Sequence, residues 1–300
     1  MTDRNAIWTP MGLDITGAKS VEEVLNRADI NFTVDKSYIY DSAGNVIPGY
    51  IANRRSDNNN LLGIVSNKYT IVQNSEAFDF INNLVPEGIE FERGGVWHNG
   101  TAVWIEAKLP NTVKILDDDI ESHIIFINSH NGKGSVRVCM LPNRVVCANQ
   151  LNFALKTAQR AWSAVHSSQV NYKLKTAAET LGLADKYMTE LTKSAEELAA
   201  KKFTETEFIN LIDKMYPLNE DDSNRKITNV SEIRSGLIDC YHSEDNSNFV
   251  GTAWGALGAV TDYFDHSAPQ RATAIAMDAK WEKIANGYSV VDKFYTALAA

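Results

Sequence analysis

The sequence contains few cysteines and no long apolar run. Its 300 residues include three cysteines, Cys139, Cys147 and Cys240, and no Cys-x-x-Cys pair. So sparse a set argues against a disulfide framework and against a cysteine-rich zinc site, and it fits a reducing compartment. No apolar run approaches the ~18 residues of a membrane-spanning helix, and the first residues lack the apolar core of a signal peptide. These absences favour a cytoplasmic protein without a membrane partner.

Acidic residues are missing from one long stretch. Residues 122–178 contain no Asp or Glu but seven basic side chains, whereas the rest of the chain has 22 basic against 38 acidic residues. Net acidity, −9 for the whole chain, weakens the case for a nucleic-acid partner because phosphate repels negative charge. The field at a binding surface is set locally, however. This segregation of charge is the strongest functional feature of the sequence.

Motifs that name a reaction are also missing. There is no phosphate-binding loop, dinucleotide fingerprint or G-x-S-x-G, so we expect no catalytic residue and no cofactor. Cys147 at a helix start could be a nucleophile, but a buried structural cysteine is the simpler interpretation. Asp262 and His266 are spaced to hold a metal, although an acidic helix end is simpler. The acidic run 117–119 could bind a divalent ion, but such turns are usually solvated.

The first half of the sequence is predicted to be rich in strands. The pair Ser20 and Glu23 forms a capping box for a short helix, and another helix is expected at 75–84. Asn99-Gly100 lies between alternating runs and predicts a hairpin over Phe91–Leu109 with a type I′ turn. Residues 114–120 are expected to form an acidic connector. Further strands are predicted at 31–34, 38–40, 47–55 and 61–65.

The second half is predicted to be almost entirely helical. From Val170 to Leu198, apolar residues recur at alternating spacings of four and three, which indicates one long heptad-patterned helix. Thr204 and Glu207 cap the next helix, and further helices are expected at 231–241, around Trp254, at 270–285 and at 289–299. The predicted fold class is α+β, with a hairpin-rich antiparallel sheet in residues 1–146 and helices in 147–300, packed together as one unit.

The acid-free stretch is interpreted as a hairpin followed by a helix. Two apolar runs, 123–129 and 135–141, flank a polar turn, and a helix is predicted over Ala148–Ser168. At 100° per residue, its apolar side chains fall on one face and polar ones on the other. Cations follow phosphate and an aromatic ring stacks on a base, as in proteins that bind single strands. The residues predicted to contact nucleic acid are Lys133, Arg137, Arg144, Asn149, Asn152, Phe153, Lys156 and Arg160.

The alternative is that Phe153 packs under a neighbouring element and the cations form an ordinary solvated face. Acid-free runs also occur without function. Both interpretations are open at this point.

Several phrases of the sequence resemble the phage/plasmid-like protein family, which is built on a domain of unknown function common in bacteriophages and prophages. The phrases are Val46–Asp57, Leu62–Asn74, Asn128–Gly132, Arg144–Leu151 and Thr252–Ala256. The resemblance covers most of the chain and implies a phage or mobile-element protein in the cytoplasm of a bacterial host. It implies no mechanism. The chain departs from the expected pattern at Asn131, where Asp is expected, and at Gln150, where Thr is expected.

A weaker resemblance concerns shape. Two hairpins followed by a helix, with cations at the second hairpin and the helix, are similar to the core of single-strand annealing proteins of the Red-beta and RecT kind. That resemblance implies a groove that holds one strand by its backbone in an oligomer. It would make the cations backbone contacts and Phe153 a stacking contact.

Our leading hypothesis is a phage-encoded protein that binds single-stranded DNA and anneals complementary strands as a homo-oligomer in recombination or replication. The alternative is a non-enzymatic interaction protein that engages a host protein, such as a defence component, through its acidic surface and long helix. A third is a divalent-metal nuclease that uses Asp262 and His266.

Overall fold

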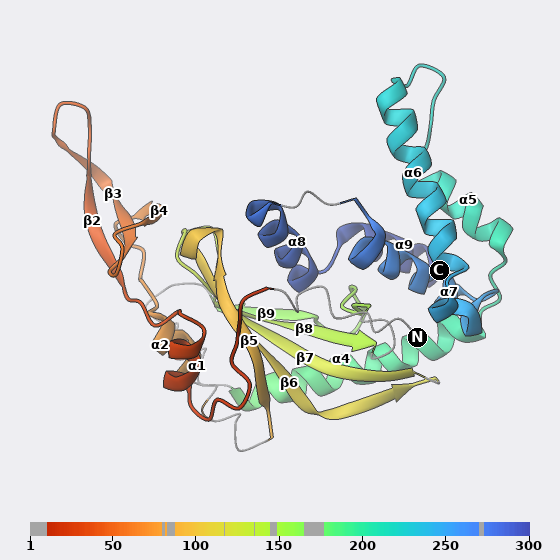
Figure 1. The fold of residues 1–300 in the computed structure, drawn as a ribbon, viewed down its shortest axis with the longest axis horizontal. Helices are drawn as coiled ribbons and strands as arrows, with labels where there is room; N and C mark the ends of the chain where they lie inside the picture. Colours follow the sequence, from red (N-terminus) through yellow and green to blue (C-terminus); the bar gives the residue numbers. More distant parts are fainter. Residues whose placement is uncertain are drawn as a thin grey trace.

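The computed structural model describes residues 11–79, 82, 88–116, 118–134, 136–144, 149–164, 177–269 and 273–300. A three-stranded sheet stands at one end, a six-stranded sheet occupies the middle, and helices pack on that sheet and gather at the other end (Figure 1). The predicted α+β class is confirmed, with antiparallel sheets in the first half and helices in the second. Among the described residues, no helix combines the length and apolar character needed to cross a membrane.

The six-stranded sheet is antiparallel, in the order β1-β5-β6-β7-β8-β9. Its predicted first hairpin is confirmed, and the turn residues His98, Asn99 and Gly100 all have positive φ. The second predicted hairpin is confirmed by β7 and β8. The strands are β1 Leu13–Asp14, β5 Glu90–Trp97, β6 Ala102–Ile115, β7 Asp118–Ser129, β8 Val136–Arg144 and β9 Ala161–Ala164.

The predicted acidic connector at 114–120 is wrong. Strand β6 runs to Ile115 and β7 begins at Asp118, with these two residues paired. The apolar side chains of Ile115 and Ile120 are buried, which draws this acidic segment into the sheet.

The two faces of the six-stranded sheet pack against different helices. Side chains such as Ile105 and Ile124 join a large cluster that extends from Ile15 to Leu298. The opposite face carries Trp104, whose ring centroid lies 5.2 Å from that of Trp281 on α8. Because the large cluster takes side chains from both predicted regions, the described parts of residues 1–146 and 147–300 share one core.

The helices follow the predicted caps closely. Ser20 accepts a hydrogen bond from the Glu23 amide, and Thr204 accepts one from Glu207. In the described part of the heptad segment, seam residues such as Met188 are buried. The helices are α1 Val21–Arg27, α2 Asn74–Phe78, η3 His98–Gly100, α4 Ala177–Ala200, α5 Glu205–Met215, α6 Asn224–Tyr241, η4 Glu244–Phe249, α7 Ala253–Asp262, η5 Tyr263–Ser267, α8 Ala274–Asn286 and α9 Ser289–Leu298.

The helix predicted over Ala148–Ser168 is wrong. Its described part, residues 149–164, contains no helix: it bridges to β8 at Gln150, leaves that edge through a series of bends and pairs with β8 again in β9. Its backbone satisfies the free edge of β8: the Leu151 amide donates to Pro142 and the Met140 amide donates to Arg160. The backbone of these residues pairs with the open edge of β8 and does not form a helix, because the buried N–H and C=O groups at that edge need hydrogen-bond partners.

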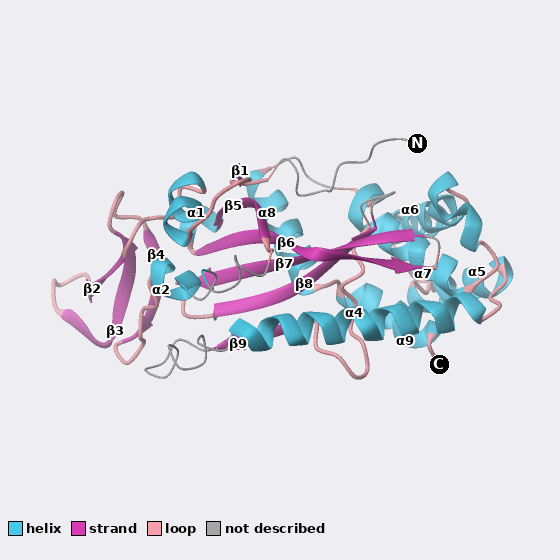
Figure 2. Cartoon of the chain, turned by 90° about the horizontal axis from the view of Figure 1, so that it is seen from below, coloured by secondary structure: helices cyan, strands magenta, loops and turns pink. Residues whose placement is uncertain are grey.

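Strands β2 Val34–Tyr40, β3 Val46–Arg55 and β4 Leu61–Ser66 form the second sheet. We call residues 34–66 the arm, because both views show it standing away from the six-stranded sheet (Figures 1 and 2). At its base, Asn53 donates to the backbone oxygen of His130 at 2.8 Å. A Cβ on Gly63 would lie 2.6 Å from Asn131, so a side chain there would separate the arm from the 131–134 turn.

Candidate nucleic-acid interface

Four of the eight residues predicted to contact nucleic acid are buried. Arg144 is 2% exposed, and its Nη2 lies 2.6 Å from Oδ2 of Asp118. Its guanidinium also lies 5.7 Å from the centre of the Phe249 ring. This cation neutralises a buried carboxylate, so in this structure it cannot reach phosphate.

The predicted polar face is not formed, because residues 149–153 are not helical and are all buried. Phe153 is 1% exposed and stacks on Tyr295, with ring centroids 4.6 Å apart. Asn152 donates its side-chain amide to the backbone oxygen of Ile284, and Asn149 is also buried. The alternative interpretation of Phe153, packing under a neighbouring element, describes its position.

The remaining predicted cations lie in separate places. Arg160 is half-buried and donates to both carboxylate oxygens of Asp292 at 2.7 and 2.9 Å. Arg137 is half-buried on β8, and Lys156 is exposed beside α4 and α9. Lys133 is exposed on the turn at the base of the arm. The structure therefore does not unite the eight residues in one surface.

The arm carries the largest concentration of exposed apolar side chains. Seven of the 13 large hydrophobic side chains exposed among the described residues belong to it. They are Tyr38, Tyr40, Val46, Ile47, Tyr50, Leu61 and Ile64. Contiguous exposed apolar side chains commonly mark a binding surface.

The arm has two distinct faces. Tyr38 pairs with Ile51 and Ile51 with Val65, and directly paired side chains share a face. A Cβ on Gly132 would lie 2.6 Å from Val65, so this face packs on the 131–134 turn. We call it the inner face and the opposite one, which carries Tyr50 and Ile64, the outer face.

Beyond the turn, the inner face presents aromatic rings and cations. The β2–β3 register shifts between Tyr38 and Tyr40, but the extra residues belong to β3, so the two rings keep the alternation of β2. They are 68% and 58% exposed. Lys36 precedes them on the same face and donates to the backbone oxygen of Tyr69. Lys133 follows the turn residues that this face contacts. Two rings and two cations thus lie along one side of the arm.

Two of the three carboxylates of the arm, those of Asp41 and Asp57, accept hydrogen bonds from neighbouring residues. Asp57 accepts two hydrogen bonds from Arg55, at 2.9 and 2.6 Å, and these hydrogen bonds hold the pKa of the Asp57 carboxyl below its usual range. Hydrogen bonds from Asn45 likewise lower the pKa of Asp41. Residues 34–66 contain three basic and three acidic residues. The arm therefore lacks the negative charge that the chain as a whole carries.

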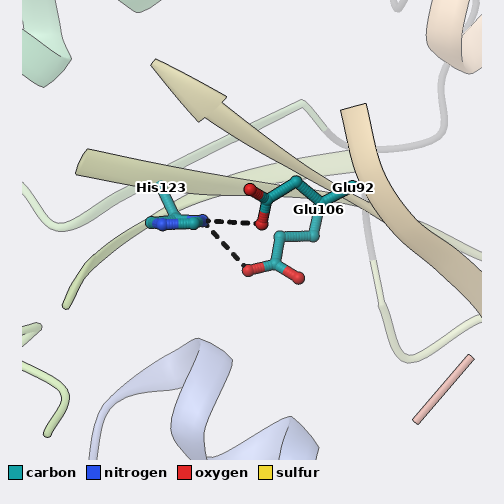
Figure 3. Close-up of side chains that lie close together, drawn as sticks. All are labelled: Glu92, Glu106 and His123. Carbon is teal, nitrogen blue, oxygen red and sulfur yellow. Dashed lines mark ion pairs between the residues drawn. The ribbon is translucent and has the colours of Figure 1, made fainter. Parts of the chain in front are cut away.

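Potential metal ligands gather away from Asp262 and His266, the pair on which the third hypothesis depends. Asp262 lines a pocket of about 650 Å³ with Asp239, but neither belongs to a group of three potential ligands among the described residues. Of these residues, Glu92, Glu106 and His123 form such a group (Figure 3). Burial disfavours protonation of His123, yet the neighbouring carboxylates outweigh it and raise its pKa to about 9.

Neither the group of Glu92, Glu106 and His123 nor the exposed aromatic face of the arm was predicted from the sequence. Glu106 is the one acidic residue in the apolar strand run 102–107, and its carboxylate is fully buried, so an acid at a core position was the available indication. Tyr38 and Tyr40 belong to a recognised strand, but strand alternation alone does not tell which face meets solvent.

A comparison with protein families gives one match. The model described as domain of unknown function (DUF932) matches residues 61–284. Neither the curated proteins nor the solved structures contain a significant match to the chain.

Proposed function

The chain belongs to the family defined by the domain of unknown function DUF932, and from this premise we propose that it binds single-stranded DNA along the inner face of the arm. The observation that carries the proposal is the exposed stripe of Lys36, Tyr38 and Tyr40. Tyrosine rings stack on bases of any identity, and cations follow the phosphates between them. The acid-free turn that ends in Lys133 supports the same side of the arm.

A role in phage or prophage recombination or replication belongs to this proposal. The resemblance of the arm phrases to phage proteins supports it, and the site of action is then the cytoplasm of a bacterial host. Annealing by a homo-oligomer follows from the second face: Tyr50 and Ile64 on the outer face are 55% exposed each, which suits contact between neighbouring copies while the inner face holds a strand.

The test is fluorescence anisotropy of a labelled single-stranded oligonucleotide. Replacing Tyr38 or Tyr40 with Ala is expected to weaken binding by about 1–3 kcal/mol, roughly five- to 150-fold in Kd. Both side chains are exposed, so folding is not at stake. Tyr50→Ala is the matched control on the outer face and should leave the affinity unchanged. Equal affinities for all three variants and the parent protein would refute the inner face as the site.

Salt dependence gives an independent check on the cations. Lys133→Gln should flatten the plot of log affinity against log salt by about 0.7, the slope of one single-strand phosphate contact. Lys156→Gln is the control, because Lys156 is also exposed but lies beside α4 and α9. If Lys156→Gln flattens the salt dependence more than Lys133→Gln does, the strand binds near Lys156, as predicted from the sequence, and not along the arm.

The outer face favours a second candidate function, a protein that engages a host protein. Tyr50, Leu61 and Ile64 are each half exposed, and aromatic and apolar side chains of this kind form the centres of protein interfaces. Capture from a bacterial lysate, compared with a Leu61→Ser/Ile64→Ser variant, tests it. A partner that the variant captures equally well would exclude the outer face.

A further inference from the structure

We propose that Glu92, Glu106 and His123 form a binding site for a divalent transition-metal ion. The three side chains converge from neighbouring strands of the six-stranded sheet (Figure 3). This sheet is separate from the arm, so the inference does not depend on strand binding.

The sheet register brings the three residues together. Glu106 on β6 pairs with Ile125 on β7, and His123 lies two residues before Ile125 on the same face. Glu92 lies where the β5–β6 register shifts. A β-bulge there turns a side chain out of the regular alternation, and the Glu92 carboxylate is aimed at the imidazole (Figure 3).

The distances match those between ligands of one ion. His123 Nδ1 lies 3.2 Å from Oε1 of Glu106 and 3.4 Å from Oε2 of Glu92. All three ligand atoms lie within 4.8 Å of one another. Ligands about 2.1 Å from a metal are separated by about 3.0 Å in octahedral and about 3.4 Å in tetrahedral geometry. Small side-chain movements would therefore place an ion between them.

The burial of the Glu106 carboxylate supports a metal site independently of these distances. Glu106 is 0% exposed, and apart from the ion pair between its Oε1 and Nδ1 of His123, neither of its oxygens has a hydrogen-bond partner among the described residues. An ionised carboxylate in the core without hydrogen bonds is strongly unfavourable unless a cation compensates it. An ion pair with His123 alone leaves most of its hydrogen-bonding capacity unused.

An outer layer orients the imidazole. Nε2 of His123 lies 3.3 Å from Oε2 of Glu121, and Lys108 donates to the other oxygen of Glu121 at 2.6 Å. Metal-ligating histidines commonly donate their second ring N–H to a carboxylate, which fixes the ring and its tautomer. This arrangement assigns Nδ1 to the metal and Nε2–H to Glu121.

The charges of the cluster favour a divalent ion. Three carboxylates, of Glu92, Glu106 and Glu121, face Lys108 and His123. With a neutral imidazole, one divalent cation and Lys108 balance the three negative charges. One divalent ion is therefore enough to neutralise the cluster.

The ligand set indicates the class of ion. Carboxylates suit Mn²⁺ and imidazole suits Zn²⁺ and Fe²⁺, whereas Ca²⁺ requires six to eight oxygen ligands. Three protein ligands leave coordination positions for water or for a substrate oxygen. The Glu92 side chain is 35% exposed, so these positions face solvent.

Isothermal titration of chelator-treated protein with MnCl₂ and with ZnCl₂ tests the proposal. We expect one ion per chain, with affinity roughly 10–100-fold lower in Glu121→Gln and at least as much lower in Glu92→Gln and Glu106→Gln. Asp119→Asn is the control, an exposed acid on the same strand. The visible spectrum of the Co²⁺-loaded protein should change in His123→Gln, since an imidazole ligand is lost.

Two outcomes would overturn the site: no binding at millimolar metal, or equal affinities in the parent, Glu92→Gln and Asp119→Asn proteins, which means an adventitious ion only. If circular dichroism shows that Glu106→Gln does not fold, the metal affinity of Glu92→Gln is the deciding measurement, because Glu92 is half exposed. Metal binding without oligonucleotide binding would support this site and refute the strand-binding proposal. Oligonucleotide binding without metal binding would refute this site and leave the strand-binding proposal intact.

Discussion

Asp265 gives the protein a calculable dependence of stability on pH. The residue is 1% exposed in η5, the helical segment that follows α7, and its carboxylate accepts a hydrogen bond from the backbone amide of Gln150 at 2.7 Å. Burial raises its pKa from 3.8 to about 7, against the opposing effects of Gln150 and Lys280. Because the folded-state pKa is raised, its contribution is full below about pH 4 and is lost as pH rises through about 7. Complete ionisation costs the folded state about 4 kcal/mol.

Asp265→Asn removes this dependence, since the amide stays neutral and its oxygen can still accept from Gln150. Relative to the parent protein, the variant should gain about 3 kcal/mol of unfolding free energy between about pH 5 and pH 8.5. Urea unfolding of both proteins at the two pH values measures the difference, and all other titrating groups cancel. A gain under about 1 kcal/mol would refute the argument that this carboxyl ionises in a dry site.

Two further predictions concern buried contacts. Arg144→Ala leaves Asp118 uncompensated and should lower the unfolding free energy by about 3–5 kcal/mol, while the folded variant keeps its oligonucleotide affinity; loss of affinity in a fully folded variant would contradict the structural role. Gly63→Ala should cost about 1–3 kcal/mol and expose the arm to limited proteolysis, because its Cβ meets the Asn131 backbone. Gly182→Ala in α4 has nothing within 4 Å and should not destabilise, so an equal loss in both variants would exclude the close approach as the cause.

The sequence was sufficient where a local pattern determines structure. Asn99-Gly100 predicted the first hairpin, and the pairs Ser20–Glu23 and Thr204–Glu207 predicted two helix starts, because turn and cap chemistry act within a few residues. The buried seam of α4 followed from its spacing. These features depend on neighbours in the chain, which a sequence displays directly.

The prediction failed where distant contacts decide the outcome. Residues 149–164 have a helical spacing of apolar side chains, but β8 offers them an open edge, and α9 offers Asp292 to Arg160 and Tyr295 to Phe153. Asp292 lies 132 residues from Arg160 in the sequence, and the nearby edge of β8 becomes a partner only once the sheet has formed. The stretch is basic, but Arg144 and Arg160 form ion pairs with Asp118 on β7 and Asp292 on α9. Charge counts do not show which cations reach solvent.

The path of residues 149–164 has a consequence for the order of folding. Until they lie against β8, that strand keeps an open edge, and they are held there by α9, synthesised more than a hundred residues later. On the ribosome, the sheet would emerge long before the helix that secures its last strand. During this interval the edge of β8 is unpaired, so it is either covered by a chaperone or able to pair with another nascent chain. The rate at which translation reaches α9 thereby sets how long this protein is vulnerable to misassembly.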